Sequence, residues 1–271
     1  MIRFADISFS YAGAQGAPAL SCVAFDVEPG EQVAVLGANG SGKSTLVQLA
    51  NGLLLPDSGT VTVDGIDTRD ATRTRDVRER VGMVFQRPDD QIVATSVEDD
   101  VAFGPENLGL PRAEIRERVD EAIAAVGLAG LERREPHLLS GGQKQRLAMA
   151  GALAMRPAYL VLDEPASMLD PDGRHDVLAI VRALRASGTG VMHVTHDLAD
   201  IADADRAIVL DSGAVVFTGS VAELYGRPKL LAASGLELPP LARLADSLRG
   251  AGAPLPAGVL DAETIAGSLW P

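Results

Sequence analysis

Apolar residues near the N-terminus recur at the two-residue period of a β-strand. They form two groups, one of Ile2, Phe4, Ile7 and Phe9 and a second of Val23, Phe25 and Val27 before the turn Pro29-Gly30. Because a strand with one buried face shows this alternation, the pattern predicts an antiparallel sheet at the start of the chain. Cys22 falls in the same stretch, and we expect it to be a small, buried apolar side chain.

Later strands are predicted from short apolar runs at residues 32–36, 81–85, 159–162, 191–195 and 207–210. Helical patterns lie at residues 44–51, after Ser140 and from Asp172 onward. Strands that alternate with helices are typical of a mostly parallel sheet. Residues 61–63 are expected to extend the N-terminal sheet, and the turn Asp211-Ser212-Gly213 is expected to join two final strands.

A helical section interrupts this alternation. After Pro111, apolar residues recur at three- and four-residue spacing, as Ile115, Val119, Ile123 and Val126. This spacing predicts a helix with one apolar face, and Gly127 is expected to end it.

Composition and charge narrow the class of protein. The chain has 271 residues, of which 46% are hydrophobic, and a formal net charge of −13. This acidity argues against a protein that grips nucleic acid, which needs a basic surface. With one cysteine no intramolecular disulfide is available, which suits a reducing cytoplasm. No apolar run reaches the roughly 18 to 20 residues that span a bilayer, so a partner is expected to supply any membrane part.

A glycine-rich turn lies between the predicted strand at 32–36 and the predicted helix at 44–51. Its sequence, G-A-N-G-S-G-K-S, matches the phosphate-binding loop of nucleotide hydrolases. The backbone amides of such a loop turn toward the β-phosphate of ATP. The residues concerned are Gly37, Asn39, Gly40, Ser41 and Gly42, with Lys43 reaching the β/γ oxygens, Ser44 offering its hydroxyl to Mg²⁺ and Thr45 bonding the α-phosphate. The alternative is a glycine-rich turn with a chance lysine.

Two acids end the predicted strand at 159–162. In enzymes with a phosphate loop, such a strand brings carboxylates beside the phosphates. Asp163 is expected to hold Mg²⁺, and Glu164 is expected to act on the attacking water as general base. The alternative is a pair of solvated acids at a strand end.

The segment Leu139-Ser140-Gly141-Gly142-Gln143 resembles the signature motif of ABC ATPases. Ser140 caps a predicted helix whose first amides, left open by Gly141 and Gly142, suit a γ-phosphate. The alternative is an ordinary helix cap. The resemblance implies a head-to-tail dimer that encloses two ATP molecules, each between one phosphate loop and the opposite signature motif, with Ser140, Gly141, Gly142 and Gln143 as nucleotide contacts.

Four further residues acquire roles from the resemblance alone. It implies that Gln86 contacts Mg²⁺ or the attacking water and reports to a transmembrane partner, and that His196 contacts the γ-phosphate. It also implies that Asp170 bridges the two subunits and that Tyr11 stacks on adenine. The alternatives are a structural histidine at a strand end and a tyrosine that packs on the sheet.

Residues 86–107 resemble a narrower group, the ATPase subunits of energy-coupling factor importers of vitamins and of cobalt or nickel. Residues 136–140, 150–155 and 167–171 share this resemblance, whereas Arg87 and the pair Pro165-Ala166 depart from it. In this group the segment receives arginine-bearing helices of a transmembrane subunit. The expected acceptors are five acids, Asp89, Asp90, Glu98, Asp99 and Asp100; the alternative is a solvated acidic face.

The resemblance implies an α/β fold of the P-loop ABC ATPase type, with a mostly parallel core sheet, an antiparallel N-terminal β subdomain and a helical signature subdomain at about residues 87–155. The nucleotide-binding domain is expected to span residues 1–225 and a C-terminal appendage residues 226–271. The implied function is ATP-driven uptake of a vitamin or transition-metal ion at the cytoplasmic face of the membrane. The implied partners are a second ATPase subunit, identical or related, a transmembrane coupling subunit and a membrane-embedded substrate-binding subunit. The alternatives are another ABC importer or exporter, or a soluble ABC ATPase that acts on nucleic acid.

Overall fold

A six-stranded sheet forms the centre of the protein, whose computed structural model describes residues 1–13, 17–255 and 262–269. In spatial order the strands are β10 (Ala214–Gly219), β9 (Arg206–Asp211), β3 (Gln32–Leu36), β8 (Gly190–Thr195), β7 (Tyr159–Asp163) and β6 (Val81–Val84). The strands from β9 to β6 are parallel, and β10 pairs antiparallel with β9. The mostly parallel sheet and the final hairpin are therefore confirmed.

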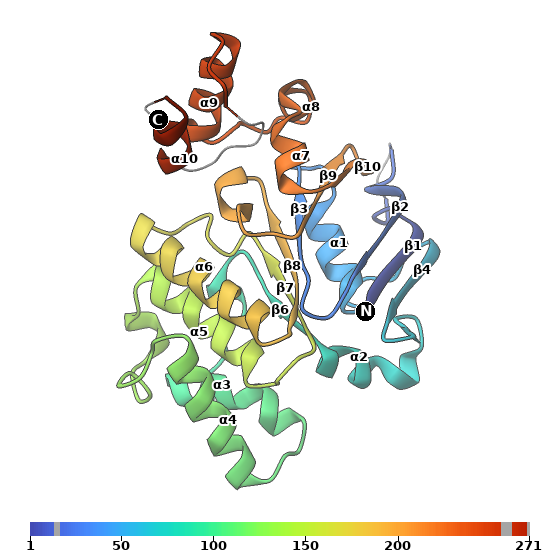
Figure 1. Cartoon of the computed structure of the whole chain (residues 1–271). Coiled ribbons are helices and arrows are strands. Elements are labelled where there is room, and N and C mark those ends of the chain that lie inside the picture. Colours follow the sequence, from blue (N-terminus) through green and yellow to red (C-terminus); the bar gives the residue numbers. More distant parts are fainter. Residues whose placement is uncertain (14–16, 256–261, 270–271) are drawn as a thin grey trace.

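A second, antiparallel sheet lies beside the first (Figure 1). Its strands, in spatial order, are β2 (Leu20–Val27), β1 (Ile2–Phe9), β4 (Ser58–Val63) and β5 (Ile66–Asp67). The alternating apolar positions of β1 and β2 are buried, as the sequence predicts. This sheet is the expected N-terminal β subdomain.

The expectation that Cys22 is buried is wrong. Its side chain is exposed, and its backbone has a φ of 49°. The pairing of β1 with β2 shifts register between Phe4 and Ile7 and again between Ile7 and Phe9. Because this irregularity places both Leu20 and Val23 on the buried face, the residues between them no longer alternate and Cys22 points outward.

The central sheet is covered on both faces. In β3, Val33 and Val35 pack with the antiparallel sheet and helix α1 (Lys43–Ala50), whereas Leu36 points to the opposite face. In β7, Tyr159 likewise packs with the first cluster and Leu160 with a helical cluster. Adjacent residues of a strand point to opposite faces, so a continuous apolar run is the sequence of a strand buried on both sides.

A helical subdomain projects from the far side of the sheet, as Figure 1 shows. It contains α3 (Val97–Asn107), α4 (Arg112–Ala125) and α5 (Gly141–Leu153), and α6 (Pro171–Ala186) packs against α5. The helix predicted after Pro111 is confirmed as α4. Gly127 follows its C-cap with a φ of 67°, the left-handed conformation that a glycine adopts without strain. A short helix, α2 (Thr74–Arg80), precedes β6.

The C-terminal segment begins with two helices that belong to the core. In α7 (Val221–Tyr225) and α8 (Pro228–Ala233), Leu224 and Leu231 pack with Leu36 of β3. A Cβ atom at Gly235 would lie 3.2 Å from Cβ of Ala38 in the glycine-rich turn, so this segment also contacts that turn. The domain boundary at residues 225/226 stays a prediction.

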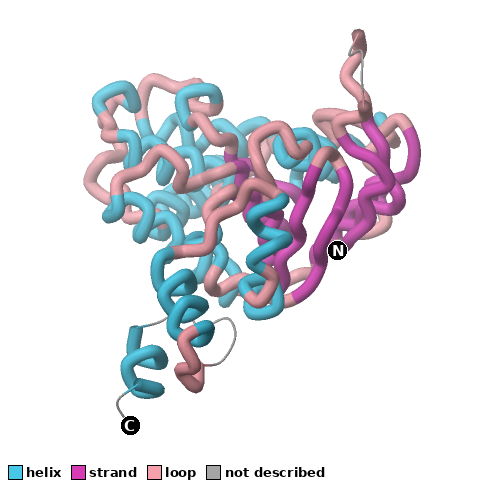
Figure 2. Tube along the Cα trace, turned by 90° about the horizontal axis from the view of Figure 1, so that it is seen from above, coloured by secondary structure: helices cyan, strands magenta, loops and turns pink. Residues whose placement is uncertain are grey.

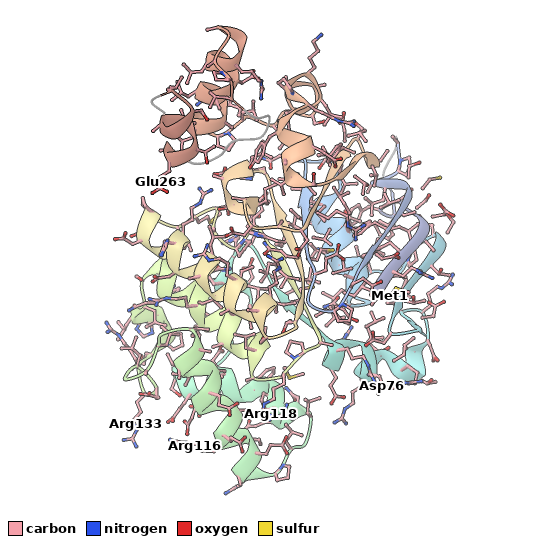
Figure 3. The ribbon with its side chains drawn as sticks, viewed as in Figure 1. Met1, Asp76, Arg116, Arg118, Arg133 and Glu263 are labelled. Atoms are coloured by element: carbon pink, nitrogen blue, oxygen red, sulfur yellow. The ribbon has the colours of Figure 1, made fainter. Side chains whose placement is uncertain are left out.

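Two further helices, α9 (Pro240–Gly250) and α10 (Ala262–Leu269), share a small cluster of their own around Ala245, Leu255 and Ile265. They project from the body of the protein (Figures 1 and 2). Figure 3 places Glu263 of α10 at the opposite end from Arg116 and Arg118 of α4. Residues 256–261 and 270–271 of the predicted appendage lie outside the described residues. Of the helices described, none combines the length and apolar character needed to cross a membrane.

Candidate functional site

The glycine-rich turn joins the end of β3 to the start of α1, which is the position that the sequence predicts. Its glycines are required by close approach. A Cβ atom at Gly37 would lie 2.4 Å from the carbonyl oxygen of Leu210, and one at Gly42 would lie 2.6 Å from that of Ala19. At Gly40, where φ is 83°, a Cβ atom would meet nothing within 4 Å. The turn is therefore packed closely against the protein at Gly37 and Gly42 and is unobstructed at Gly40, as a phosphate-binding loop must be.

Lys43 lies within the first turn of α1 with only 5% of its surface exposed. Its Nζ donates hydrogen bonds to the carbonyl oxygens of Gly37 at 2.8 Å and Ala38 at 3.0 Å. Burial lowers the pKa of Lys43, and the nearby carboxylates of Glu164 and Asp163 oppose this shift. A buried ammonium group held by two carbonyls is well placed to bind an anion that enters the turn.

Asp163 ends β7 beside the turn and is 7% exposed. Burial raises its pKa, while a hydrogen bond from Ser44 acts in the opposite direction. Glu164 follows with a φ of 47°, an uncommon conformation for a residue with a side chain, and its N–H donates to the carbonyl of Val194 at 2.8 Å. This backbone turn separates the two acids, so that they point to different parts of the site.

Glu164 is the meeting point of three other predicted residues. Gln86 Nε2 donates to Glu164 Oε2 at 3.1 Å, and His196 Nδ1 lies 3.1 Å from Glu164 Oε1. Lys43 Nζ lies 3.9 Å from the same Oε1 atom. These residues come from the ends of β6, β8 and the phosphate loop, since parallel strands bring their carboxyl ends to one edge of the sheet. The structure thus gathers the four residues that we predict to be catalytic.

A cavity of about 270 Å³ opens in front of the turn. Tyr11 borders it, and its hydroxyl is hydrogen-bonded to Thr45 Oγ1 at 3.0 Å. The tyrosine ring also packs edge-to-face on Phe9, with the ring centroids 5.0 Å apart. The complete lining consists of Tyr11, Ala19, Asn39, Gly40, Gly42, Lys43, Ser44, Thr45, Gln86 and Glu164. Gly37, Ser41, Asp163 and His196 are not part of this lining.

Two of the three residues predicted to hold Mg²⁺, Ser44 and Asp163, lie in contact, whereas the third, Gln86, is hydrogen-bonded to Glu164. The hydroxyl of Ser44 and the buried carboxylate of Asp163 are hydrogen-bonded partners, and both are the oxygen donors that Mg²⁺ prefers. Among the described residues, no group of three or more His, Cys, Asp or Glu side chains forms a metal cage. The donor set fits an ion that keeps water molecules and binds a nucleotide phosphate as well.

The segment after Leu139 forms a separate site at the start of α5. Ser140 Oγ accepts a hydrogen bond from the Gln143 amide at 3.3 Å, and Gln143 Oε1 accepts one from the Ser140 amide at 3.0 Å. This reciprocal capping box stabilises the start of α5 by pairing the amides of Ser140 and Gln143, and it does not cover the other amides of the first turn. A Cβ atom at Gly141 would meet nothing within 4 Å, so packing within the chain does not require this glycine.

Asp170 lies beside this helix end and caps α6, because its Oδ1 accepts from the amide of Gly173 at 2.9 Å. Together the two helix ends border a cavity of about 350 Å³. Its lining includes Ser140, Gly141, Gly142, Gln143 and Asp170, together with three residues that the sequence did not single out, Arg146, Asp172 and Asp176. The i, i+4 spacing of Asp172 and Asp176 places both acids on one face of the helix capped by Asp170, which is the sequence signal for these two; no such signal marks Arg146.

The two cavities share no lining residue. Ala19 in the first cavity was also missed, because only its position before β2, far from the turn in sequence, places it there. All the residues predicted to contact nucleotide are therefore divided between two places on one chain. One place holds Tyr11, the phosphate loop and Gln86, and the other holds Ser140 to Gln143 and Asp170.

This fold and these two glycine-rich sites are those of an ABC ATPase, and the ABC transporter family model matches residues 20–167. The energy-coupling factor transporter ATP-binding protein EcfA1 of Symbiobacterium thermophilum is 54% identical over 252 residues, which cover 93% of this chain and 88% of the relative. EcfA1 of Caldanaerobacter subterraneus subsp. tengcongensis is 46% identical over 268 residues, or 98% and 97% of the two chains.

The similar solved structures include the following two. The structure of cbiO1 from Clostridium perfringens, described as part of the ABC transporter complex cbiONQ, has a TM-score of 0.77 and 35% identity, covering 90% of this chain and 98% of that one. The ATP-binding cassette MJ0796, in a dimeric post-hydrolysis state bound to ADP and Pi, has a TM-score of 0.74 and 28% identity, covering 82% and 99%.

The chain therefore belongs to the ABC transporter family and, within it, to the ATP-binding proteins of energy-coupling factor transporters. The resemblance stated from the motifs is confirmed, as are the fold and the class of enzyme, an ATP hydrolase.

Proposed function

We propose that this chain energises uptake of a vitamin or transition-metal ion through an energy-coupling factor transporter, by ATP-driven closure of a dimer of ATPase subunits. In this proposal it lies on the cytoplasmic face of the membrane. Its partners are a second ATPase subunit, a transmembrane coupling subunit and a membrane-embedded substrate-binding subunit. The names of the relatives support the transporter class. The formal charge of −13 speaks against the nucleic-acid alternative.

One observation supports the dimer more than any other. The cavity in front of the glycine-rich turn, called here the phosphate-loop cavity, and the cavity bordered by Ser140 and Asp170, called the signature cavity, have no residue in common. A nucleotide in the first cavity therefore needs a second subunit to bring Ser140 to its terminal phosphate. The open space in front of Gly40 and Gly141 allows such an approach. Relatedness to a cassette solved as a dimer bound to ADP and Pi supports the same arrangement.

The chemistry is assigned to the residues gathered at the sheet edge. Lys43 exchanges its two carbonyl partners for the β/γ oxygens of ATP, and the amides of the turn hold the β-phosphate. Glu164 orients and deprotonates the attacking water, while His196 and Gln86 fix the carboxylate from either side. The amides at the start of the partner's α5 stabilise charge on the γ-phosphate in the transition state.

Ser44 and Asp163 are the residues that would hold Mg²⁺, with Gln86 as a further contact. When bound, the ion neutralises charge that develops on the phosphate oxygens. Asp163 would then carry its full negative charge, since a nearby cation counteracts the effect of burial on its pKa. ATP hydrolysis removes the terminal phosphate that joins one subunit's phosphate loop to the other's signature motif. The dimer then reopens, and this movement is passed to the transmembrane partner.

The acidic segment proposed to receive arginines of that partner needs one correction. Asp100 is buried, and its Oδ1 accepts hydrogen bonds from the amides of Val93 at 2.7 Å and Ala94 at 3.0 Å. Its carboxylate shapes the loop before α3 and is not an available acceptor. The remaining candidates form contacts within the chain at exposed or half-buried positions, Asp89 with Lys144, Asp90 with Arg87, Glu98 with Arg116 and Asp99 with Ser96.

Charge reversal tests this surface. We expect the combined Asp89→Lys, Asp90→Lys and Glu98→Lys variant to lose transport by the assembled complex while the ATPase rate of the free subunit stays within about twofold, because surface charges contribute little to the fold. Reversal of Glu117 and Glu121 of α4, which both pair with Arg156, is the matched control. Equal transport by the first variant and the parent would remove the assignment.

The proposal as a whole is tested by purifying the native complex through this chain and identifying its membrane subunits and bound cargo by mass spectrometry. We expect a transmembrane coupling subunit and a small binding subunit that carries a vitamin or a metal ion. Recovery of an exporter's membrane domains, or of nucleic acid without membrane subunits, would contradict it.

A further inference from the structure

An arginine that the ATPase motifs do not include connects two parts of the site. Arg174 lies in the first turn of α6, and its guanidinium contacts two acids of the loop after β8. Its Nη2 donates to Asp197 Oδ2 at 2.6 Å, and its Nε lies 2.7 Å from Asp200 Oδ1. A planar guanidinium can hold two carboxylates in one fixed arrangement, which an ammonium group cannot.

These two acids fix the backbone on both sides of His196. Thr195 Oγ1, just before the histidine, accepts from the Asp197 amide at 3.0 Å and is hydrogen-bonded to Asp200 Oδ2 at 3.2 Å. Asp197 Oδ1 also accepts from the Ala199 amide at 2.9 Å. The side chain of Asp200 is only 3% exposed, so its charge requires the arginine.

The backbone of Arg174 contacts Asp170, which lines the signature cavity. The Arg174 amide donates to the carbonyl of Asp170 at 2.9 Å, and Asp170 caps the same helix through Gly173. His196 in turn lies 3.1 Å from Glu164. A continuous series of short contacts therefore runs from Asp170, through Arg174 and the loop, to the carboxylate that is proposed to act on water.

Neighbouring groups distinguish Arg174 from Arg182 of the same helix. Arg182 Nη1 contacts Asp203 Oδ2 at 3.3 Å, but both side chains are about half exposed, and such a pair adds little. His193, fully buried in β8, has no hydrogen-bond partner for either ring nitrogen among the described residues. Burial, aided by Arg174, lowers the pKa of His193 to about 4, so this histidine is neutral at pH 7 and does not repel the arginine.

We propose that Arg174 is a positioning residue: it ties the His196 loop to the Asp170 end of α6, so that contact with the second subunit is passed to the hydrolytic carboxylate. This inference rests on the proposed function, in which Asp170 meets the partner and His196 meets the γ-phosphate. Arg174 lines neither the phosphate-loop cavity nor the signature cavity. It acts by setting where His196 stands when the dimer closes.

The test compares steady-state ATP hydrolysis by full-length variants. Arg174→Gln alone leaves Asp200 buried without its cation, so the informative variant is Arg174→Gln combined with Asp200→Asn. We expect kcat to fall on the order of 10-fold, because a small displacement of a positioned group has effects of that size or larger. The KM for ATP is expected to stay within about twofold, since the phosphate loop and Tyr11 are untouched. Arg182→Gln is the matched control, with both constants unchanged.

The second arm repeats the double change in a His196→Ala background. If Arg174 acts through His196, the change adds no further loss there, since the two effects are not independent. Arg174→Lys keeps the charge without the planar fork, and we expect a smaller fall in kcat at unchanged KM. This variant also serves if the double variant does not fold.

The outcomes separate two failures. Parental kcat in the Arg174 variants, together with slow hydrolysis by His196→Ala, overturns the positioning role alone. An equal loss from the Arg174 change with and without His196 overturns it as well, as does an equal loss in Arg182→Gln. Parental hydrolysis by His196→Ala instead overturns the proposed role of His196 and, with it, the basis of this inference.

Discussion

The phosphate-loop region and the signature region differ in how far each is completed by its own chain. At the phosphate loop, Lys43, Asp163 and Glu164 are nearly buried and contact one another or nearby carbonyls. At the signature region, Ser140 and Gln143 cap a helix at the surface, and Met168 nearby is 69% exposed.

This contrast teaches that the first region is preorganised for chemistry, whereas the second is preorganised for contact. Buried charges keep a fixed geometry because leaving one unpaired is costly. A capped helix end at the surface has free amides directed outward and nothing of its own chain to bind. The residues proposed to be catalytic are thus present in each subunit, and the proposed trigger comes from another.

The largest expected effect separates chemistry from closure. Glu164→Gln should lower kcat by about 10² to 10⁴-fold, the range for loss of a general base, while ATP binding is retained. Because hydrolysis no longer ends the bridge, the variant should accumulate as a closed dimer with ATP, which light scattering after gel filtration would detect. A parental rate of hydrolysis would show that Glu164 is not the base.

A second change acts on closure and leaves the chemistry intact. Ser140→Asp keeps a good helix cap but places a negative charge where the γ-phosphate is expected, so hydrolysis should fall roughly 10² to 10³-fold and ATP should no longer induce dimers. Ser140→Asn is the control, since asparagine caps equally well without charge. Equal behaviour of the two variants would mean that no phosphate approaches this helix end.

A smaller effect is expected at the adenine side of the phosphate-loop cavity. Tyr11→Ala should weaken ATP binding about tenfold, because base stacking contributes about 1–3 kcal/mol. Tyr11→Phe keeps the ring and loses only the contact to Thr45, so binding should stay within about threefold. Fluorescence titration with a labelled ATP measures both. Unchanged binding by Tyr11→Ala would leave the tyrosine with a packing role on Phe9.

The smallest expected effect is on stability and depends on pH. Burial raises the pKa of Asp163 in the folded protein, so its charged form destabilises the nucleotide-free state at pH 7. Asp163→Asn should therefore raise the melting temperature by a few degrees at pH 7. The gain should shrink as the pH falls through the raised pKa of the folded protein toward 3.8, the usual value for aspartate, and should vanish below it, where the carboxyl is protonated in both folded and unfolded chains. A gain that is constant with pH would point to another cause.

The sequence reveals those parts of the protein whose structure is local. The phosphate-binding turn from Gly37 to Gly42 is predicted from the sequence alone, because the turn and the helix that follows occupy consecutive residues. Ser140 is read equally well, since the capping box needs only Ser140 and Gln143. The five parallel strands are predicted to within one residue at each end, because a short, continuous apolar run between turns is typical of a strand buried on both faces.

Other features depend on residues far apart in sequence. The exposure of Cys22 follows from a register shift against β1, which no local pattern displays. The contact of Gly235 with Ala38 appears only once the C-terminal helices meet the loop after β3. The pairing of Arg174 with Asp197 and Asp200 appears only once α6 packs beside the loop after β8. The same is true of Asp100. The charged stretch around it predicts an exposed acceptor for a partner's arginine, but in the folded protein its carboxylate is buried and accepts two backbone hydrogen bonds.

The central claim is that one subunit's Ser140 completes the site built by another subunit's phosphate loop. A crystal structure of the Glu164→Gln variant with bound ATP measures this directly. We expect Ser140 Oγ of one subunit at about 3 Å from a γ-phosphate oxygen of the nucleotide held by the other, which is hydrogen-bond distance. A structure with the nucleotide bound and Ser140 far from every triphosphate would contradict the account.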